Sequence, residues 1–95
     1  MAWLQRNSQG DFVRDVQGLL WQSGLYQGRI DGRYGPKTEE AVKEWQNFVG
    51  VKADGKWGAQ TIGQTANMLA TLNANNSNLK NNMPIVPVVQ KKGGL

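Results

Sequence analysis

Two aspartates are the side chains of this 95-residue chain that most resemble catalytic groups. Asp31 and Asp54 each precede a glycine, and a pair of carboxylates flanking a sugar bond is what glycoside hydrolysis requires. Aspartate before glycine is also a common turn sequence, in which the carboxylate accepts backbone hydrogen bonds. We favour the turn interpretation and expect Asp31 and Asp54 to shape loops rather than to catalyse.

The composition removes most other enzyme mechanisms. The chain contains neither His nor Cys, which excludes disulfides, cysteine nucleophiles, zinc sites of the usual kind and every Ser-His or Cys-His pair. Thr38 and Thr61 lack a base that could activate a hydroxyl, so we expect both to make local hydrogen bonds near helix starts. The sequence therefore predicts a protein that is not an enzyme, with no catalytic residue, no metal and no cofactor.

The positive charge of the chain is concentrated near its C-terminal end. A net charge of +4 and a pI near 9.7 are typical of nucleic-acid binders. Residues 1–72 nevertheless carry eight Lys or Arg against seven Asp or Glu, and the remaining excess comes from Lys80, Lys91 and Lys92. No apolar run approaches the roughly 18 residues of a membrane span. We therefore expect neither nucleic acid nor membrane as a partner.

An internal repeat surrounds the two aspartates. A shift of 23 residues aligns 29–38 with 52–61, and the shared unit is Asp-Gly, a basic residue, an aromatic, Gly, two variable residues and Thr. The Asp-Gly pair predicts a turn, the aromatic a plug or edge of the core, and the second glycine an unusual backbone angle before a helix. The expected loop-shaping residues are Asp31, Gly32, Gly35, Asp54, Gly55 and Gly58.

Apolar spacing predicts three helices that would hold these loops, over residues 11–23, 36–49 and 59–72. Ser8 followed by Asp11 resembles a capping box for the first helix, which Gly24 would end. Pro36 would open the second helix and Gly50 would stop it. The apolar stripes of the three helices comprise Phe12, Val13, Val16, Leu19 and Leu20, then Ala41, Val42, Trp45, Phe48 and Val49, then Ile62, Ala66, Leu69 and Leu72.

The pattern fails beyond Leu72. Residues 73–82 include six Asn and one Ser, and they offer little apolar surface to bury. Residues 83–89 are apolar, but Pro84 and Pro87 exclude a helix and a central strand. We therefore expect an all-α fold, a compact three-helix bundle over residues 1–72, followed by a disordered tail or linker over residues 73–95.

The loop-helix repeat carries a family resemblance. The stretch 24–46, together with the second Asp-Gly-x-aromatic-Gly-x-x-Thr unit, resembles the three-helix peptidoglycan-binding domain of bacterial and phage cell-wall hydrolases, endolysins among them. The resemblance covers residues 4–70. Asn7 stands where the family often has Gly, which is tolerable because Asn accepts the left-handed region. Trp45 replaces the more usual Phe, and Ile62-Gly63 departs from the family pattern in the third helix. The opening helix resembles that of the family through Ser8, Gly10, Val13, Gln17 and Leu20.

This resemblance implies a binding function. A domain of this family binds peptidoglycan non-covalently and concentrates an attached or partner hydrolase on the wall, as a monomer in the bacterial cell wall or the extracellular space. The first six residues lack the basic and then apolar pattern of a secretory signal. Matrix metalloproteinase pro-domains share the fold but act through a cysteine, which this chain lacks.

The loops supply the expected ligand-binding residues. A loop Tyr or Trp suits both a half-buried plug and a surface that stacks on a sugar ring. Neighbouring cations have an electrostatic reason to bind the carboxylates of peptidoglycan stem peptides. The predicted binding residues are Tyr26, Arg29, Tyr34, Lys37, Lys52 and Trp57.

Two other classes of function stay open at this point. One is an interaction module of a phage or a secretion apparatus that kept the fold without its ligand. The other is a small helix-turn-helix nucleic-acid binder, supported by three helices and the high pI. Sedimentation with purified sacculi separates the first from peptidoglycan binding, and salt-sensitive binding to any DNA would favour the second.

Overall fold

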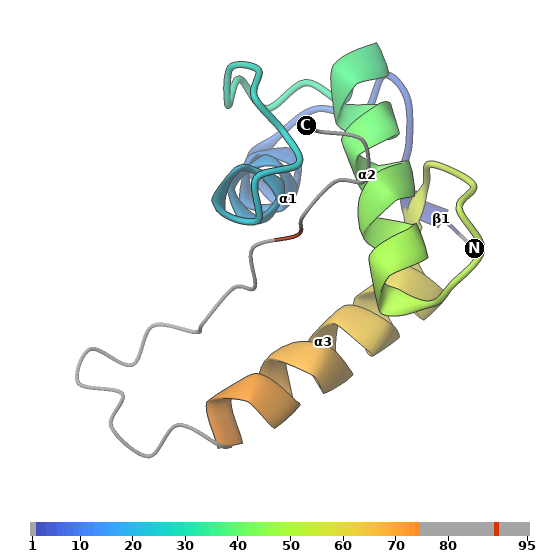
Figure 1. The fold of residues 1–95 in the computed structure, drawn as a ribbon. Coiled ribbons are helices and arrows are strands. Elements are labelled where there is room, and N and C mark those ends of the chain that lie inside the picture. The colour runs from blue at the N-terminus through green and yellow to red at the C-terminus, as the bar shows by residue number, and fades with distance from the viewer. Residues whose placement is uncertain (1, 75–88, 90–95) are drawn as a thin grey trace, which may run out of the picture.

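The computed structural model describes residues 2–74 and residue 89. Five elements follow in the order β1 (Ala2–Leu4), α1 (Asp11–Gln22), α2 (Pro36–Val49), β2 (Trp57–Gly58) and α3 (Ala59–Ala74). The helix α2 contacts both other helices, and the last turns of α3 extend beyond α1 and α2 (Figure 1). The prediction of three helices is confirmed, with all three starting at the predicted residues. None of the helices described is long and apolar enough to cross a membrane.

The helix α1 begins differently from the prediction. Its N-cap is Gly10, with φ of 124° and no side-chain cap, and the Ser8 hydroxyl instead accepts a hydrogen bond from the Gln5 N–H at 3.1 Å. The predicted Ser8 cap is therefore wrong, because Ser8 turns the N-terminal segment before the helix starts. Gly24 follows the helix with φ of 86°, as its predicted terminating role requires.

The buried face of α1 excludes one residue that we assigned to it. Val13, Val16 and Leu20 are buried at spacings of three and four residues, and Gln17 is buried with them. Phe12 is 78% exposed, because a residue next to Val13 lies about 100° around the helix from the packed face. The prediction of Phe12 as a core residue is therefore wrong.

The helix α2 supplies the centre of the core. It opens at Pro36 and ends at Gly50 in the left-handed region, both as predicted. Trp45 is fully buried, and its indole N–H donates to the Thr65 hydroxyl of α3 at 2.8 Å. Phe48 is 41% exposed and tilts against Trp45 with ring centroids 5.5 Å apart, so it covers the core from outside instead of belonging to it.

The helix α3 presents a different face from the one that apolar spacing predicts. Thr61 and Thr65 are buried, whereas Ile62 and Ala66 are exposed. The reason is that both threonines receive hydrogen bonds from buried side chains of α2, which fixes the rotation of α3. Leu69 is partly buried, and the side chain of Leu72 lies outside the part that the structure describes.

An N-terminal segment ties the two loops together, which the sequence did not reveal. The strand β1 pairs antiparallel with β2, opposing Ala2 to Gly58. The Asn7 N–H then donates to the Tyr34 carbonyl at 2.9 Å, with Asn7 at φ of 78° as its left-handed tolerance allows. Residues 2–10 therefore contact both loops of the repeat.

The apolar core gathers side chains from α1, α2 and both loops, and α3 adds Met68 at its edge. Leu4, Leu19, Val49, Met68 and Val89 pack against it from the edge. The Val89 N–H also donates to the Ser23 carbonyl at 2.8 Å, so one residue of the predicted tail contacts the domain. Most of the tail prediction concerns residues 75–88 and 90–95, which lie outside the described part. The buried apolar residues are Val13, Val16, Leu20, Leu25, Tyr26, Tyr34, Ala41, Val42, Trp45 and Trp57.

Candidate ligand-binding surface

The first loop, residues 24–35, is organised around a buried glutamine of α1. The Gln17 side-chain amide nitrogen is placed to donate to Asp31 Oδ1 at 3.1 Å, the Arg33 carbonyl at 2.9 Å and the Thr38 hydroxyl at 3.0 Å. Its side-chain oxygen accepts the Gly32 N–H at 2.9 Å. One amide therefore holds both sides of the turn and the first turn of α2.

The second loop, residues 50–58, repeats this arrangement around a glutamine of α2. The Gln46 nitrogen is placed to donate to Asp54 Oδ1, the Lys56 carbonyl and the Thr61 hydroxyl at 2.8 to 2.9 Å. The Gln46 oxygen accepts the Gly55 N–H at 2.9 Å. Each loop thus rests on a glutamine cradle, by which we mean this set of contacts made by Gln17 or Gln46.

The two aspartates serve the turns, as predicted. Each carboxylate accepts a hydrogen bond from the backbone N–H two residues later, at Arg33 and at Lys56, in both cases at 2.9 Å. These backbone N–H groups, followed by the glutamine amides, hold the pKa of Asp31 and of Asp54 below its usual value. Ionised carboxylates committed to turns are poor proton donors, so this arrangement supports no acid catalysis.

Glycine is required at one position of each turn but not at the other. Gly32 and Gly55 adopt φ of 75° and 77°, which confirms the Asp-Gly turns. Gly35 has φ of −101°, and Gly58 is absent from the described residues with positive φ. The predicted unusual angle at the second glycine is therefore wrong, because the chain enters each following helix from ordinary extended backbone.

The three loop aromatics are buried. Tyr34 is 1% exposed, and its hydroxyl donates to the Gly55 carbonyl at 2.6 Å, which joins the first loop to the second. Desolvation by burial raises the pKa of this phenol. Trp57 and Tyr26 are also buried, at 7% and 6% exposure. The predicted stacking of Tyr26, Tyr34 and Trp57 on a sugar ring lacks the exposed ring face that it needs, and the plug interpretation describes their position.

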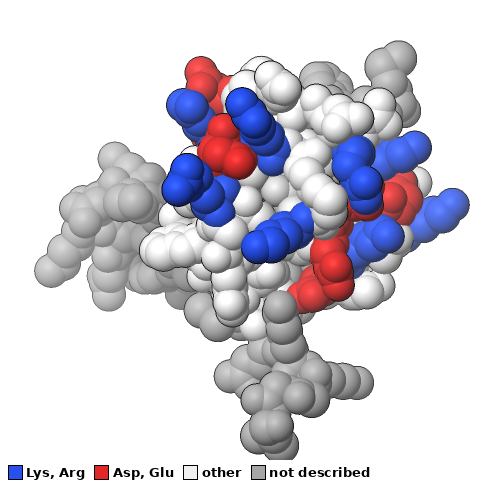
Figure 2. All heavy atoms as spheres, turned by 90° about the horizontal axis from the view of Figure 1, so that it is seen from above, with Lys and Arg blue, Asp and Glu red and all other residues white. Residues whose placement is uncertain are grey.

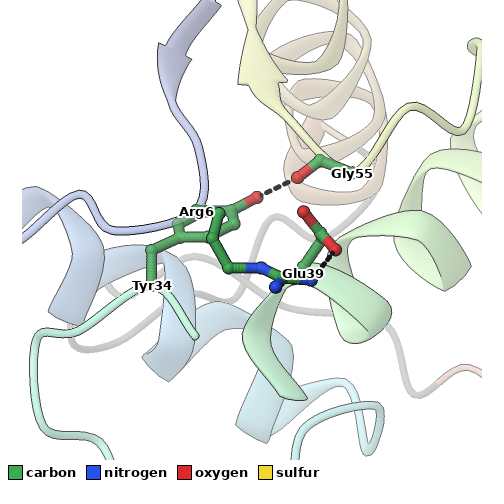
Figure 3. A network of polar contacts seen from close by, with 4 residues as sticks. All are labelled: Arg6, Tyr34, Glu39 and Gly55. Atoms are coloured by element: carbon green, nitrogen blue, oxygen red, sulfur yellow. Dashed lines mark hydrogen bonds and ion pairs between the residues drawn. The ribbon is translucent and has the colours of Figure 1, made fainter. Parts of the chain in front are cut away.

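A polar network beside Tyr34 attaches the N-terminal segment to α2. Arg6 donates to Glu39 at 2.6 Å, and the hydrogen bond from Tyr34 to Gly55 lies next to this ion pair (Figure 3). The hydrogen bond from Arg6 is the main cause that lowers the pKa of Glu39. These contacts fix the side of the molecule on which the two loops meet.

The predicted cations are exposed and distributed over the surface. Arg29, Lys37 and Lys52 are all exposed. Lys37 and Tyr26 line one hollow, whereas Lys52 lines another. Cationic and anionic side chains lie intermixed on the face shown in Figure 2. A face with both signs of charge is unsuited to a polyanion such as nucleic acid.

Two polar hollows flank the loops. The first-loop pocket has a volume of about 420 Å³ and lies between residues 25–28 and α2. Its lining includes Leu25, Tyr26, Gly28, Lys37, Glu40 and Glu44. The second-loop pocket, of about 330 Å³, lies between the second loop and the start of α3, and its lining includes Lys52, Asp54, Lys56 and Gln60.

An apolar hollow occupies another side of the molecule. It has a volume of about 510 Å³ between α1, β1 and the start of α3, with Asp15 as its charged residue. Its lining includes Leu4, Phe12, Val16, Leu19, Trp57 and Ile62. Among the described residues, no group of three or more acidic side chains is placed to hold a metal ion.

Gln17 and Gln46 are the residues whose role the sequence analysis missed. Both precede a repeat unit, but Gln17 lies 14 residues before its aspartate and Gln46 only 8 before its own. The fixed shift of 23 residues that aligns the loops therefore does not align the glutamines. The sequence feature that could have indicated this role is a glutamine on an otherwise apolar helix face.

Comparison with known proteins identifies relatives of this arrangement. A family model described as a peptidoglycan binding domain matches residues 9–64, a range that includes α1, α2 and both loops. The crystal structure of the SleB N-terminal domain superimposes with a TM-score of 0.64 and 32% sequence identity, covering 68% of this chain and 89% of that one. The all-α fold predicted from the sequence is confirmed by this likeness.

Two curated relatives are much longer than the chain. The spore cortex-lytic enzyme of Bacillus subtilis (strain 168) is 44% identical over 59 residues, which cover 61% of this chain and 19% of the enzyme. The N-acetylmuramoyl-L-alanine amidase CwlM of Mycobacterium tuberculosis is 38% identical over 53 residues, which cover 56% of this chain and 13% of that protein. The similarity is thus to a short part of each relative.

Proposed function

Because the chain belongs to the peptidoglycan-binding domain family, we propose that its residues 1–72 bind bacterial peptidoglycan and carry out no chemistry of their own. The observation that carries this function is the family match over residues 9–64, which includes both cradled loops. The geometry agrees with a binding role, since both loop aspartates are engaged by backbone N–H groups.

The aromatic side chains of the loops are buried, whereas the cationic side chains are exposed. The aromatics hold the loops from within, and the predicted cations Arg29, Lys37 and Lys52 are exposed. Carboxylates of peptidoglycan stem peptides are suitable partners for them, because hydrogen bonds between two charged groups are stronger than neutral ones. We therefore retain Arg29 and Lys37, which lie in the first loop and at the start of α2, as ligand contacts, and move the three aromatics into the supporting core. Lys52 lines a separate hollow, so we leave it outside the binding surface.

The affinity of such a surface is expected to be modest. Polar hollows with exposed cations support binding of about 4 to 8 kcal/mol, which corresponds to dissociation constants from about millimolar to micromolar. A polymer with repeated sites compensates for weak single contacts by raising the local concentration of ligand. A monomeric domain is sufficient for this role.

The relatives suggest which kind of enzyme the domain concentrates at the cell wall. One relative is named as a spore cortex-lytic enzyme and another as an N-acetylmuramoyl-L-alanine amidase, and the chain matches a small fraction of each. In our proposal the domain concentrates a cell-wall hydrolase, attached or separate, at the bacterial wall or outside the cell. Its role is then to raise the time that the hydrolase spends on its substrate.

Sedimentation with purified sacculi tests the proposed function. The protein is expected to sediment with sacculi and to be released by soluble peptidoglycan fragments but not by DNA. A single-domain protein of similar charge that lacks this fold is the control for charge-driven retention. Protein that stays entirely in the supernatant would contradict the function and favour an interaction module, and release by DNA would favour a nucleic-acid binder.

A further inference from the structure

The first-loop pocket carries charges of both signs on one helix. Lys37, Glu40 and Glu44 line it from α2, at spacings of three and four residues that place them on the same helix face. The buried side chains of Leu25 and Tyr26 and the buried Ala41 contribute its apolar part. The pocket thus combines one ammonium group and two carboxylates with an apolar lining.

This combination selects among the chemical groups of peptidoglycan. Two carboxylates repel a polyanion, and a neutral glycan carries no charge that could pair with the three charged groups of the pocket. Sugar rings are usually bound on exposed aromatic faces, and the exposed aromatics among the described residues, Phe12, Trp21 and Phe48, do not line this pocket. A group with an ammonium next to a carboxylate is complementary to both signs of charge.

We propose that the first-loop pocket binds a zwitterionic amino-acid group of the peptide stem, with its carboxylate at Lys37 and its ammonium at Glu40 and Glu44. Such a group ends the side chain of the diamino acid in an uncrosslinked stem. This inference rests on the proposed function, because it names the part of peptidoglycan that the domain recognises.

The wall of the pocket is held in place by the first loop. The Tyr26 hydroxyl donates to the Arg29 carbonyl at 2.6 Å and lies 3.3 Å from the Gln17 amide nitrogen, which fixes the ring. Gly28 lies against this ring so closely that an added Cβ would be 2.8 Å from the Tyr26 hydroxyl oxygen. The glycine therefore lets the loop close over the ring and leaves the pocket beside it.

The second-loop pocket provides a contrast within the same molecule. It is lined by two lysines, while its carboxylate, Asp54, already accepts the Lys56 N–H and a hydrogen bond from Gln46. A site of this composition suits an anion but not an ammonium group. Lys52 is therefore a matched control for Lys37, since both are exposed lysines that line polar hollows.

The test measures binding of a defined stem peptide by isothermal titration calorimetry. The probe is a synthetic L-Ala-γ-D-Glu-diaminopimelate-D-Ala peptide, acetylated at its first residue so that the remaining ammonium is on the diamino acid. Lys37→Gln and Glu40→Gln are each expected to weaken binding by about threefold to tenfold, the range of partly exposed charge-assisted contacts. Lys52→Gln and Asp15→Asn, which line other hollows, are expected to change it less than twofold.

Blocked peptides assign each charge to its partner. Acetylation of the diamino-acid ammonium is expected to remove the effect of Glu40→Gln, and conversion of the adjacent carboxylate to an amide is expected to remove the effect of Lys37→Gln. Circular-dichroism melts confirm that the variants remain folded, which is expected because Lys37 and Glu40 are exposed.

Two results would overturn the inference. One is undiminished peptide binding by both pocket variants, and the other is equal binding of a glycan oligomer that lacks peptide. Binding to sacculi distinguishes a wrong pocket assignment from a wrong proposed function. If wild type sediments with sacculi while the pocket variants bind the peptide normally, peptidoglycan binding stands and the pocket assignment falls. If wild type does not sediment, the proposed function itself fails.

Discussion

The two loops of the repeat use the same cradle but differ in length and in what they present. Gln17 is separated from its aspartate by 14 residues, and Gln46 from its own by 8. The longer first loop uses the difference to place Leu25, Tyr26 and Gly28 against α2, where they line the first-loop pocket. We infer that the contacts common to both loops stabilise the fold. The first-loop segment that has no counterpart in the second loop then serves to bind the ligand.

The aromatic positions of the repeat show the same division. Tyr34 and Trp57 are equivalent in sequence and both are buried, but Tyr34 joins the two loops through the Gly55 carbonyl, whereas Trp57 belongs to β2 and lines the apolar hollow. Equivalent residues therefore plug the core in both copies, and specificity is expected from the variable positions of the repeat, such as Lys37, and from residues outside it.

The largest effect is expected from removing the support that both loops share. Trp45→Ala should lower the free energy of unfolding by about 3 to 5 kcal/mol, because it empties the centre of the core and leaves the Thr65 hydroxyl without its indole donor. A thermal melt followed by circular dichroism measures this loss. Trp45→Phe keeps most of the volume and isolates the hydrogen bond. A melt of Trp45→Ala that matches wild type would show that α2 does not anchor both loops.

Matched changes in the two cradles test whether they are equivalent. Gln17→Leu and Gln46→Leu should each lower the free energy of unfolding by about 1 to 3 kcal/mol, because each leaves a buried glycine N–H unpaired and removes a hydrogen bond to a threonine hydroxyl. Urea denaturation gives the global loss, and hydrogen exchange at Gly32 and Gly55 reports each loop separately. Faster exchange in the untouched loop, or no loss in one variant, would break the equivalence.

Removal of single hydroxyls compares a contact between loops with a contact within one loop. Tyr34→Phe should cost about 1 to 2 kcal/mol, because it leaves the buried Gly55 carbonyl unpaired. Tyr26→Phe should cost less, about 0.5 to 1 kcal/mol, because the Arg29 carbonyl is only partly buried. Chemical denaturation of both variants gives the order. The reverse order would show that the loops are held together elsewhere.

The smallest effect on stability is expected from lowering the pH. Asp31 and Asp54 have lowered pKa values in the folded state, mainly through the N–H groups of Arg33 and Lys56, so their ionised forms stabilise the fold above the unfolded pKa of about 4. This stability should be lost progressively as the pH falls through and below about 4. Urea midpoints from pH 5 downward measure it. Asp31→Asn and Asp54→Asn should flatten the profile to similar extents, and a large asymmetry would contradict the matched turns.

Much of the fold follows from the sequence because its signals are local. Pro36, Gly24 and Gly50 mark helix ends by their own backbone preferences, and the structure confirms all three. The burial of Thr61 and Thr65 in place of Ile62 could not be predicted, because hydrogen bonds from Gln46 and Trp45 set the rotation of α3. Strand β1 was not predicted, because a three-residue strand is too short to show an alternating pattern of apolar and polar residues.

The candidate site was less predictable than the fold. The repeat pointed to Tyr34 and Trp57, but a repeated aromatic is equally suited to plugging two equivalent loops, and both rings are buried. Tyr26 and Lys37 were both predicted as binding residues, and both line the first-loop pocket. Glu40 and Glu44 were not among the predicted site residues, since nothing local shows that the chain places residues 25–28 opposite them.

Titration of ¹⁵N-labelled protein with soluble peptidoglycan fragments tests most directly the claim that the shared cradles serve the fold and the first loop serves the ligand. We predict chemical-shift changes that saturate and cluster at Gly28, Lys37 and Ala41, with the amides of Gly32 and Gly55 and the region of Lys52 nearly unchanged. Changes that cluster around Lys52 and Gln60, or spectra that do not change at all, would contradict the account.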